Sequence, residues 1–143
     1  MQKPESDHKF STAWKSSTQP RKQRKYRYNA PLHLKQKSLR VHLSPELRKK
    51  YGFRNVLVHK GDKVKVMSGQ FAKREGKVNR VWLKRERVYV DGVELIKKEG
   101  SKVPLALAPA KLMILELELG DKIRREKLER KIKGNKTHQG ERK

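Results

Sequence analysis

Residues 61–78 read GDKVKVMSGQFAKREGKV and contain the pattern that decides the fold. Val64 and Val66 alternate with lysines, which predicts a strand with one apolar and one basic face. A basic loop bounded by Gly69 and Gly76 follows, and Gly-Lys-Val then opens a second strand. Like charges crowded on one loop repel each other, so this loop predicts a partner of opposite charge.

The two-residue alternation continues on both sides of this stretch. Alternating segments lie at 55–59, 63–66, 77–83, 87–90 and 113–119. They predict about five short strands within residues 54–119, which we expect to form the β domain. The apolar positions slip from even to odd after Val78, which predicts a β-bulge or a sharp bend. A sheet this small closes most simply on itself as a barrel, because closure removes exposed edges.

Two turn signals lie between the later strands. The dipeptide Asp91-Gly92 is typical of a hairpin turn, but a bend within one longer strand is equally compatible with these residues. Residues 97–102, with the sequence KKEGSK, predict a clearer turn.

The segment before the predicted barrel is basic and poor in apolar residues. Residues 1–28 lack helical or strand periodicity, so we expect a basic disordered extension over residues 1–30. Residues 31–53 predict two short helices and a linker, because Pro31 and Ser44 both provide helix-start signals and Gly52 provides a stop.

A basic helix is predicted after the barrel, within residues 120–143. Asp121 is a capping residue for a helix over 122–133, and Gly134 is expected to end it. Its apolar residues form only a thin stripe, which favours docking on RNA or on another protein. The remaining residues predict a polar tail.

The composition restricts the possible classes of function. The chain has 143 residues, with 39 Lys+Arg against 15 Asp+Glu and a formal net charge of +24. This charge favours nucleic acid as the partner over an anionic membrane surface. No Cys is present, which excludes disulfides and thiolate catalysis. No apolar run reaches the roughly 18 residues needed to cross a bilayer, so we expect an intracellular chain without membrane insertion.

Positive charge is concentrated in three runs, at 21–27, 73–77 and 84–87. A solvated protein face is the ordinary explanation of such runs, but phosphates of a nucleic acid would stabilise all three by releasing counterions. Tyr26 and Tyr28 lie among the arginines of the first run, and unpaired RNA bases stack on such rings. Phe71 and Trp82 fit either RNA stacking or the barrel core.

Catalytic and metal-binding patterns are weak in this sequence. The five histidines are scattered and none has a ligand spacing such as His-x₃-His. Asp62 and Asp91 lie in turns, where short carboxylates commonly cap the backbone. The glycines at 69 and 76 precede a strand and not a helix, so they do not form a phosphate-binding loop. We expect no enzyme activity, no cofactor, no metal and no small-molecule substrate.

The opening stretch resembles a known motif once its surroundings are considered. GDKVKVMSGQFAKREGKVNRV is similar to a KOW motif, which elongation factors of transcription also carry. The segments PRKQRKYRYNAPLHLKQK and LSPELRKKYG before it, and APAKLMILELELGDKIRREKLERK after it, resemble one family throughout. That family is large-subunit ribosomal protein twenty-four in its archaeal and eukaryotic form, called twenty-six in eukaryotes. The resemblance covers roughly residues 18–133.

The resemblance implies a fold, a function and a set of RNA-facing residues. The fold would be an SH3-like barrel, and the chain would be a structural constituent of the large ribosomal subunit in the cytoplasm. It would bind large-subunit rRNA near the 5′ end, act early in assembly, and lie near the polypeptide exit beside other ribosomal proteins. Many members of the family carry a glycine where this chain has Lys73.

Charge and motif position together give the RNA-binding candidates. These are Arg21, Lys22, Arg24, Lys25, Arg27, Lys63, Lys65, Gln70, Lys73, Arg74, Lys77, Arg80, Lys84 and Arg85. Gly61, Gly69 and Gly76 are expected to hold the turns, and at Gly76 we expect either a positive φ or a close approach of the RNA backbone.

Two other classes of protein share parts of this pattern. A KOW-type transcription elongation factor would bind RNA polymerase, but such factors usually carry a separate α/β domain, and residues 1–54 are too short and basic to form one. A DNA-compacting basic protein would show no preference for folded rRNA over duplex DNA.

Overall fold

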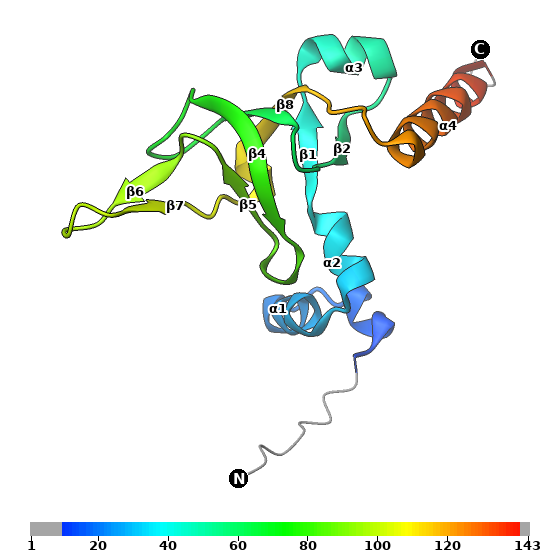
Figure 1. Cartoon of the computed structure of the whole chain (residues 1–143). Coiled ribbons are helices and arrows are strands. Elements are labelled where there is room, and N and C mark those ends of the chain that lie inside the picture. Colours follow the sequence, from blue (N-terminus) through cyan, green and yellow to red (C-terminus); the bar gives the residue numbers. More distant parts are fainter. Residues whose placement is uncertain (1–9, 141–143) are drawn as a thin grey trace.

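The computed structural model describes residues 10–140 and confirms a mainly β protein with helices before and after the sheet (Figure 1). Six strands form one sheet in the order β2-β1-β8-β3-β4-β5. They are β1 (Arg40–Leu43), β2 (Asn55–Leu57), β3 (Lys63–Val66), β4 (Glu75–Trp82), β5 (Arg87–Val90) and β8 (Leu112–Glu116). A separate hairpin is formed by β6 (Glu94–Ile96) and β7 (Lys102–Pro104). The five strands predicted from the alternation are all present, and the structure adds β1, β6 and β7.

Residues 40–43, which were expected to form a linker between the two short helices, form strand β1 instead. It pairs antiparallel with β2 and parallel with β8, and Val41 and Leu43 are both completely buried. Only four residues alternate here, between two helix signals, which is too short a pattern to identify a strand. The packing of Val41 and Leu43 in the core stabilises the strand, so the sheet begins before residue 54.

Asp91 and Gly92 form a turn that belongs to neither of the two expected arrangements. The amide of Val93 donates to the carbonyl of Val90 at 3.2 Å, and Gly92 has a φ of +77°. The turn leads from β5 into β6, which pairs with β7 and not with β5. The predicted turn at 97–102 is confirmed, since Lys97 donates to the carbonyl of Ser101 at 2.9 Å and closes the β6–β7 hairpin.

The core lies under one face of the sheet and contains the alternating residues. Its strand members are Val41, Leu43, Val56, Val64, Val66, Val78, Val88, Val90, Leu112 and Ile114. The predicted bulge is confirmed in the β4–β5 pairing, where the register shifts between Val78 and Arg80. Phe71, one of the two aromatics with an open assignment, is 9% exposed and belongs to this core.

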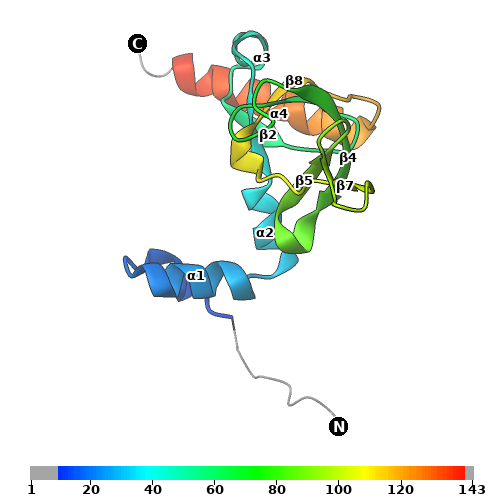
Figure 2. The same cartoon turned by 90° about the vertical axis from the view of Figure 1, so that its left-hand side faces the viewer.

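The first helices form an arm that is separate from the sheet. A 3₁₀ turn, η1 (Thr12–Ser16), packs beside α1 (Pro20–Asn29), and α2 (Leu32–Ser38) connects α1 to β1 (Figure 2). Within residues 10–30, η1 and α1 differ from the extension without regular structure that the sequence predicts, and residues 1–9 of that extension lie outside the described residues. Pro20 is preorganised for a first turn, and the Arg, Lys and Gln residues that follow are good helix formers. No residue of α1 is buried, which is why no apolar period reveals it.

Helix α3 (Pro45–Tyr51) confirms its predicted caps. The hydroxyl of Ser44 accepts a hydrogen bond from the amide of Leu47 at 3.3 Å, and Gly52 follows in the left-handed region with a φ of +73°. Both ends are satisfied by side-chain or backbone groups, as helix termini require.

Helix α4 (Lys122–Gly140) begins where the sequence predicts and ends later. The carboxylate of Asp121 accepts from the amide of Ile123 at 3.0 Å, which caps the first turn. Gly134 lies inside the helix, so the expected stop is wrong. A glycine inside a helix costs only about 1 kcal/mol relative to alanine, and the residues on both sides of Gly134 can continue the helix.

Candidate nucleic-acid interface

Two of the predicted charge runs meet in one groove. The groove has a volume of about 880 Å³ and lies between α1, α2 and the 3₁₀ turn η2 (Leu83–Arg85), which connects β4 to β5. Its lining residues are Arg24, Arg27, Tyr28, Lys35, Trp82, Lys84, Arg85, Glu86 and Arg87. We call it the basic groove. Residues about 60 positions apart thus present six cationic side chains to one space, and phosphate groups are the natural counterions.

Lys35 holds the two sides of the basic groove together. Its ammonium group donates to the carbonyl of Tyr28 at 3.0 Å and to the carbonyl of Lys84 at 3.4 Å. The first carbonyl lies near the end of α1 and the second lies in η2, so one side chain from α2 connects both. Sequence reasoning missed Lys35 because nothing in the helix pattern distinguishes it from its neighbours. Arg87 was also absent from the predicted RNA-binding residues, although it lies in the third charge run.

Trp82 is half-buried at the edge of the basic groove. The guanidinium groups of Arg85 and Arg80 lie 4.9 Å and 5.6 Å from the centre of its ring. Both distances are within the range of cation–π attraction. Trp82 therefore orders two of the predicted RNA-binding arginines on the surface.

The other predicted residues of α1 do not line the basic groove. Arg21, Lys22 and Lys25 are exposed but do not line it. Lys25 lies 5.0 Å from the ring centre of Trp14 in the preceding turn, and Phe10 packs against Tyr26 with ring centres 5.1 Å apart. These contacts pack α1 on its own N-terminal turn, while Arg24, Arg27 and Tyr28 line the basic groove.

The loop between β3 and β4 presents a second, smaller group of candidates. Gln70 and Lys73 are exposed, and backbone hydrogen bonds of 2.8 Å from Lys73 to Val66 and from Val66 to Arg74 hold the loop. Lys73 has a φ of +71°, a conformation that glycine adopts at little cost and lysine rarely adopts. The backbone at Lys73 therefore has a conformation that suits glycine better than lysine.

Arg74 is bound partly by the protein itself. Its guanidinium donates to the carbonyl of Gly92 at 3.1 Å and lies 4.9 Å from the ring centre of Phe71. The side chain is exposed, so it can still meet a phosphate, but its position is fixed by these two contacts.

The packing of the protein itself requires a glycine at position 76. Its φ is not positive, and a Cβ atom at this position would overlap the carbonyl oxygen of Asp91 and lie 2.9 Å from Val90 Cγ1. The end of β5 thus approaches β4 too closely for any side chain. Gly61 and Gly69, with φ values of +91° and +101°, occupy turns that need a left-handed residue.

Acidic neighbours partly neutralise the predicted lysines of the sheet. Lys63 forms an ion pair with Glu116 at 3.0 Å, and Lys65 forms one with Glu75 at 3.3 Å. The hydrogen bond to Glu116, and then its charge, raises the pKa of Lys63. Lys77 lies beside Lys63 in the β3–β4 register and is exposed. This face is therefore a weaker candidate for RNA binding than the groove.

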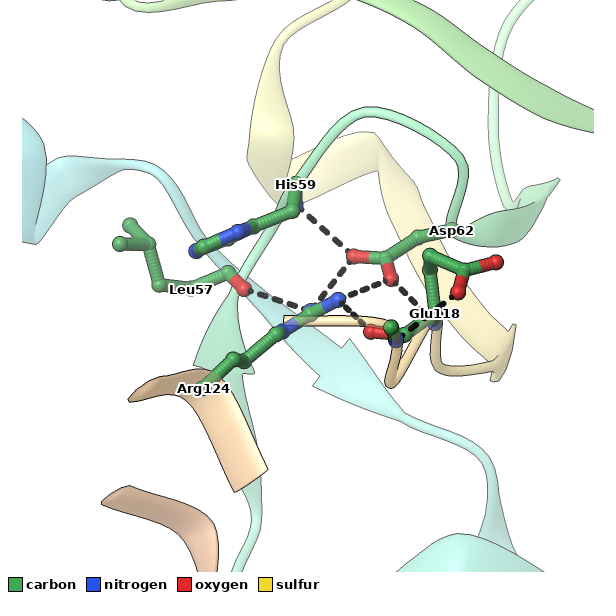
Figure 3. A network of polar contacts seen from close by, with 6 residues as sticks. Leu57, His59, Asp62, Glu118 and Arg124 are labelled. Atoms are coloured by element: carbon green, nitrogen blue, oxygen red, sulfur yellow. Dashed lines mark hydrogen bonds and ion pairs between the residues drawn. The ribbon is translucent and has the colours of Figure 1, made fainter. Parts of the chain in front are cut away.

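A buried ion pair attaches α4 to the sheet, and sequence reasoning missed it (Figure 3). Asp62 is completely buried and Arg124 is 6% exposed. The guanidinium donates to both carboxylate oxygens at 2.6 and 2.7 Å, and to the carbonyls of Glu118 and Leu57 at 2.7 and 3.2 Å. Asp62 also accepts from the amide of His59 at 2.8 Å, which is the turn-capping role expected of it. The partner on α4 and the amide of Glu118, which donates to Asp62 at 2.9 Å, were not predicted.

His59 lies beside this pair, and its pKa is lowered there. Burial, and then the positive charge of Arg124, lower the pKa of His59 below 6.5. The nearby carboxylates of Asp62 and Asp121 oppose the shift without cancelling it.

Within residues 10–140, no three His, Asp or Glu side chains gather so that they could hold a metal ion. Nor does that part of the chain contain a helix both long enough and apolar enough to cross a membrane.

Comparison with known proteins identifies the family to which the chain belongs. Residues 17–131 match the family model that describes the eukaryotic ribosomal proteins L26 and their archaeal counterparts, L24. The chain is 50% identical over 112 residues to the large ribosomal subunit protein uL24 of Methanoculleus marisnigri, covering 78% of this chain and 93% of that protein. The protein therefore belongs to the family of large ribosomal subunit proteins that comprises eukaryotic L26 and archaeal L24.

Proposed function

We propose that this chain binds large-subunit rRNA near its 5′ end, early in assembly of the subunit. The basic groove is the observation that supports rRNA binding most strongly, because it gathers six cationic side chains from α1, α2 and the β4–β5 connection. Such a surface binds phosphates by counterion release. The resemblance to the family supports the 5′ end, the early role, a cytoplasmic location and a place near the polypeptide exit, beside neighbouring ribosomal proteins.

In this role the chain positions segments of RNA and does not catalyse a reaction. A net charge of +24 opposes compaction of the free chain, and bound RNA removes this repulsion. The six-stranded sheet places the groove and the β3–β4 loop at opposite ends of β4, about 23 Å apart for eight extended residues. Two contacts at this separation fix the orientation of RNA segments relative to each other.

Binding to the 5′ third of an archaeal large-subunit rRNA tests this function. Arg27→Gln with Arg85→Gln removes two groove charges, and Lys97→Gln with Lys98→Gln removes two charges from the β6–β7 turn as a matched control. The groove variant is expected to lower the slope of log K against log salt by roughly 1.5–2 units. The control is expected to lower it far less. Equal effects of the two variants would show that the groove is not the binding surface.

Incorporation into subunits tests the same function in cells. A tagged chain is expected to sediment with large subunits in a sucrose gradient after a high-salt wash, and the groove variant is expected to be depleted there. A wild-type chain found only in free fractions or with RNA polymerase would contradict the proposal.

A further inference from the structure

We propose that the basic groove binds one unpaired nucleotide of RNA, with its base stacked on the ring of Tyr28 and its phosphate at the surrounding arginines. This inference rests on the proposed function and specifies the element of RNA that the groove recognises.

Tyr28 is an aromatic side chain that the fold does not use. It is 83% exposed, although it lines the basic groove. Burying such a ring is normally favourable, so an exposed tyrosine among cations is a suitable platform for a ligand that is itself flat and anionic. The other aromatic rings of the arm, Phe10, Trp14 and Tyr26, pack on one another.

The surroundings of Tyr28 supply the phosphate contacts. Arg24 and Arg27 precede it by four and one positions on α1, so Arg24 and Tyr28 lie on the same helical face. Arg85 and Arg87 contribute from the other side of the groove. The bond from Lys35 to the carbonyl of Tyr28 fixes the backbone that carries the ring. The backbone that carries the ring is thus preorganised before RNA binds, which lowers the entropic cost of binding.

Glu86 argues for a base in the groove and not for phosphate alone. It lines the same space and is held in a left-handed conformation with a φ of +53°. Such backbone outliers in non-glycine residues concentrate at functional sites. A carboxylate would weaken a surface that bound phosphates only, whereas it accepts hydrogen bonds from the amino and imino groups of a base edge.

An RNA duplex cannot provide the base contacts that this groove offers. Bases within a double helix already stack on each other, and the major groove of A-form RNA is too narrow for side chains. A bulged or looped nucleotide offers both a free face and a free edge. The structure therefore favours a single unstacked nucleotide as the ligand.

Two matched probes test the inference with the full-length chain. The first is an RNA hairpin with 2-aminopurine as a single bulged nucleotide, and the second is the same hairpin with that nucleotide paired. We expect the wild type to bind the bulged hairpin more tightly and to change the fluorescence of its 2-aminopurine. Equal affinity for the two hairpins would overturn the inference.

The second readout is the affinity of Tyr28 variants for the 5′ third of an archaeal large-subunit rRNA. Tyr28→Ala is expected to weaken binding by roughly 5- to 150-fold with an unchanged salt slope, and Tyr28→Phe is expected to retain binding. Ile96→Ala, which removes an exposed apolar side chain from β6, is the control. If Tyr28→Ala binds as tightly as Ile96→Ala, the inference fails. If the wild type itself does not prefer this rRNA to duplex DNA, the proposed function fails instead.

Discussion

Replacing Arg124 by methionine would leave the carboxylate of Asp62 buried without its ionic partner. Asp62 has no exposed surface in the folded protein, so its charge depends on the groups packed around it. Removing one partner of a buried ion pair costs about 3–5 kcal/mol. We expect the lower end, about 3 kcal/mol, because the amides of His59 and Glu118 still donate to the carboxylate at 2.8 and 2.9 Å.

This loss is large compared with the stability of a small protein. Domains of this size have a free energy of unfolding of about 5–15 kcal/mol, so the variant would retain a folded state with a melting temperature lower by roughly 10 °C. Urea and thermal unfolding of the full-length chain, followed by circular dichroism at pH 7, measure both quantities. Arg125→Met is the matched control, because it removes the same charge from an exposed neighbouring position of α4.

The double variant Asp62→Asn with Arg124→Met separates the ion pair from other effects. We expect it to lose less stability than the sum of its two single variants, because the buried charge is removed together with its partner. If the stability of Arg124→Met lies within about 1 kcal/mol of that of Arg125→Met, the pair does not hold α4 on the sheet and the reasoning is refuted.

Three further predictions concern single positions of the β domain. Gly76→Val is expected to cost about 1–3 kcal/mol in thermal unfolding, because the new side chain overlaps Asp91; an unchanged melting temperature would contradict the close approach. Lys73→Gly is expected to stabilise the free chain by about 0.5–1 kcal/mol, since it relieves a positive φ, while weakening RNA binding through the lost charge; a destabilised variant would show that this backbone is not strained. The lowered pKa of His59 means that the unfolded chain binds more protons below pH 6.5, so the free energy of unfolding is expected to fall as pH drops from 6.5 towards the folded pKa. His59→Gln should reduce this dependence in urea unfolding, and an identical dependence would count against the shift.

Local patterns in the sequence determined most of the regular structure. The alternation of Val64 and Val66 with lysines predicted a strand, because successive residues of a strand face opposite sides. The slip after Val78 predicted the bulge, and Ser44 with Gly52 predicted both ends of α3. Each of these signals depends on neighbours within a few positions, and for that reason it can be seen without the fold.

The tertiary structure decided the features that join distant positions. Strand β1 exists because Val41 and Leu43 complete a core supplied by other strands, and α1 escaped notice because it buries no residue. The Asp62–Arg124 pair joins positions 62 residues apart in sequence, and the basic groove joins α1 to η2. Periodicity records which face of an element is apolar, but not which other element that face meets. The charged residues that come close together therefore depend on how the helices pack against the sheet. The core as a whole sets this packing.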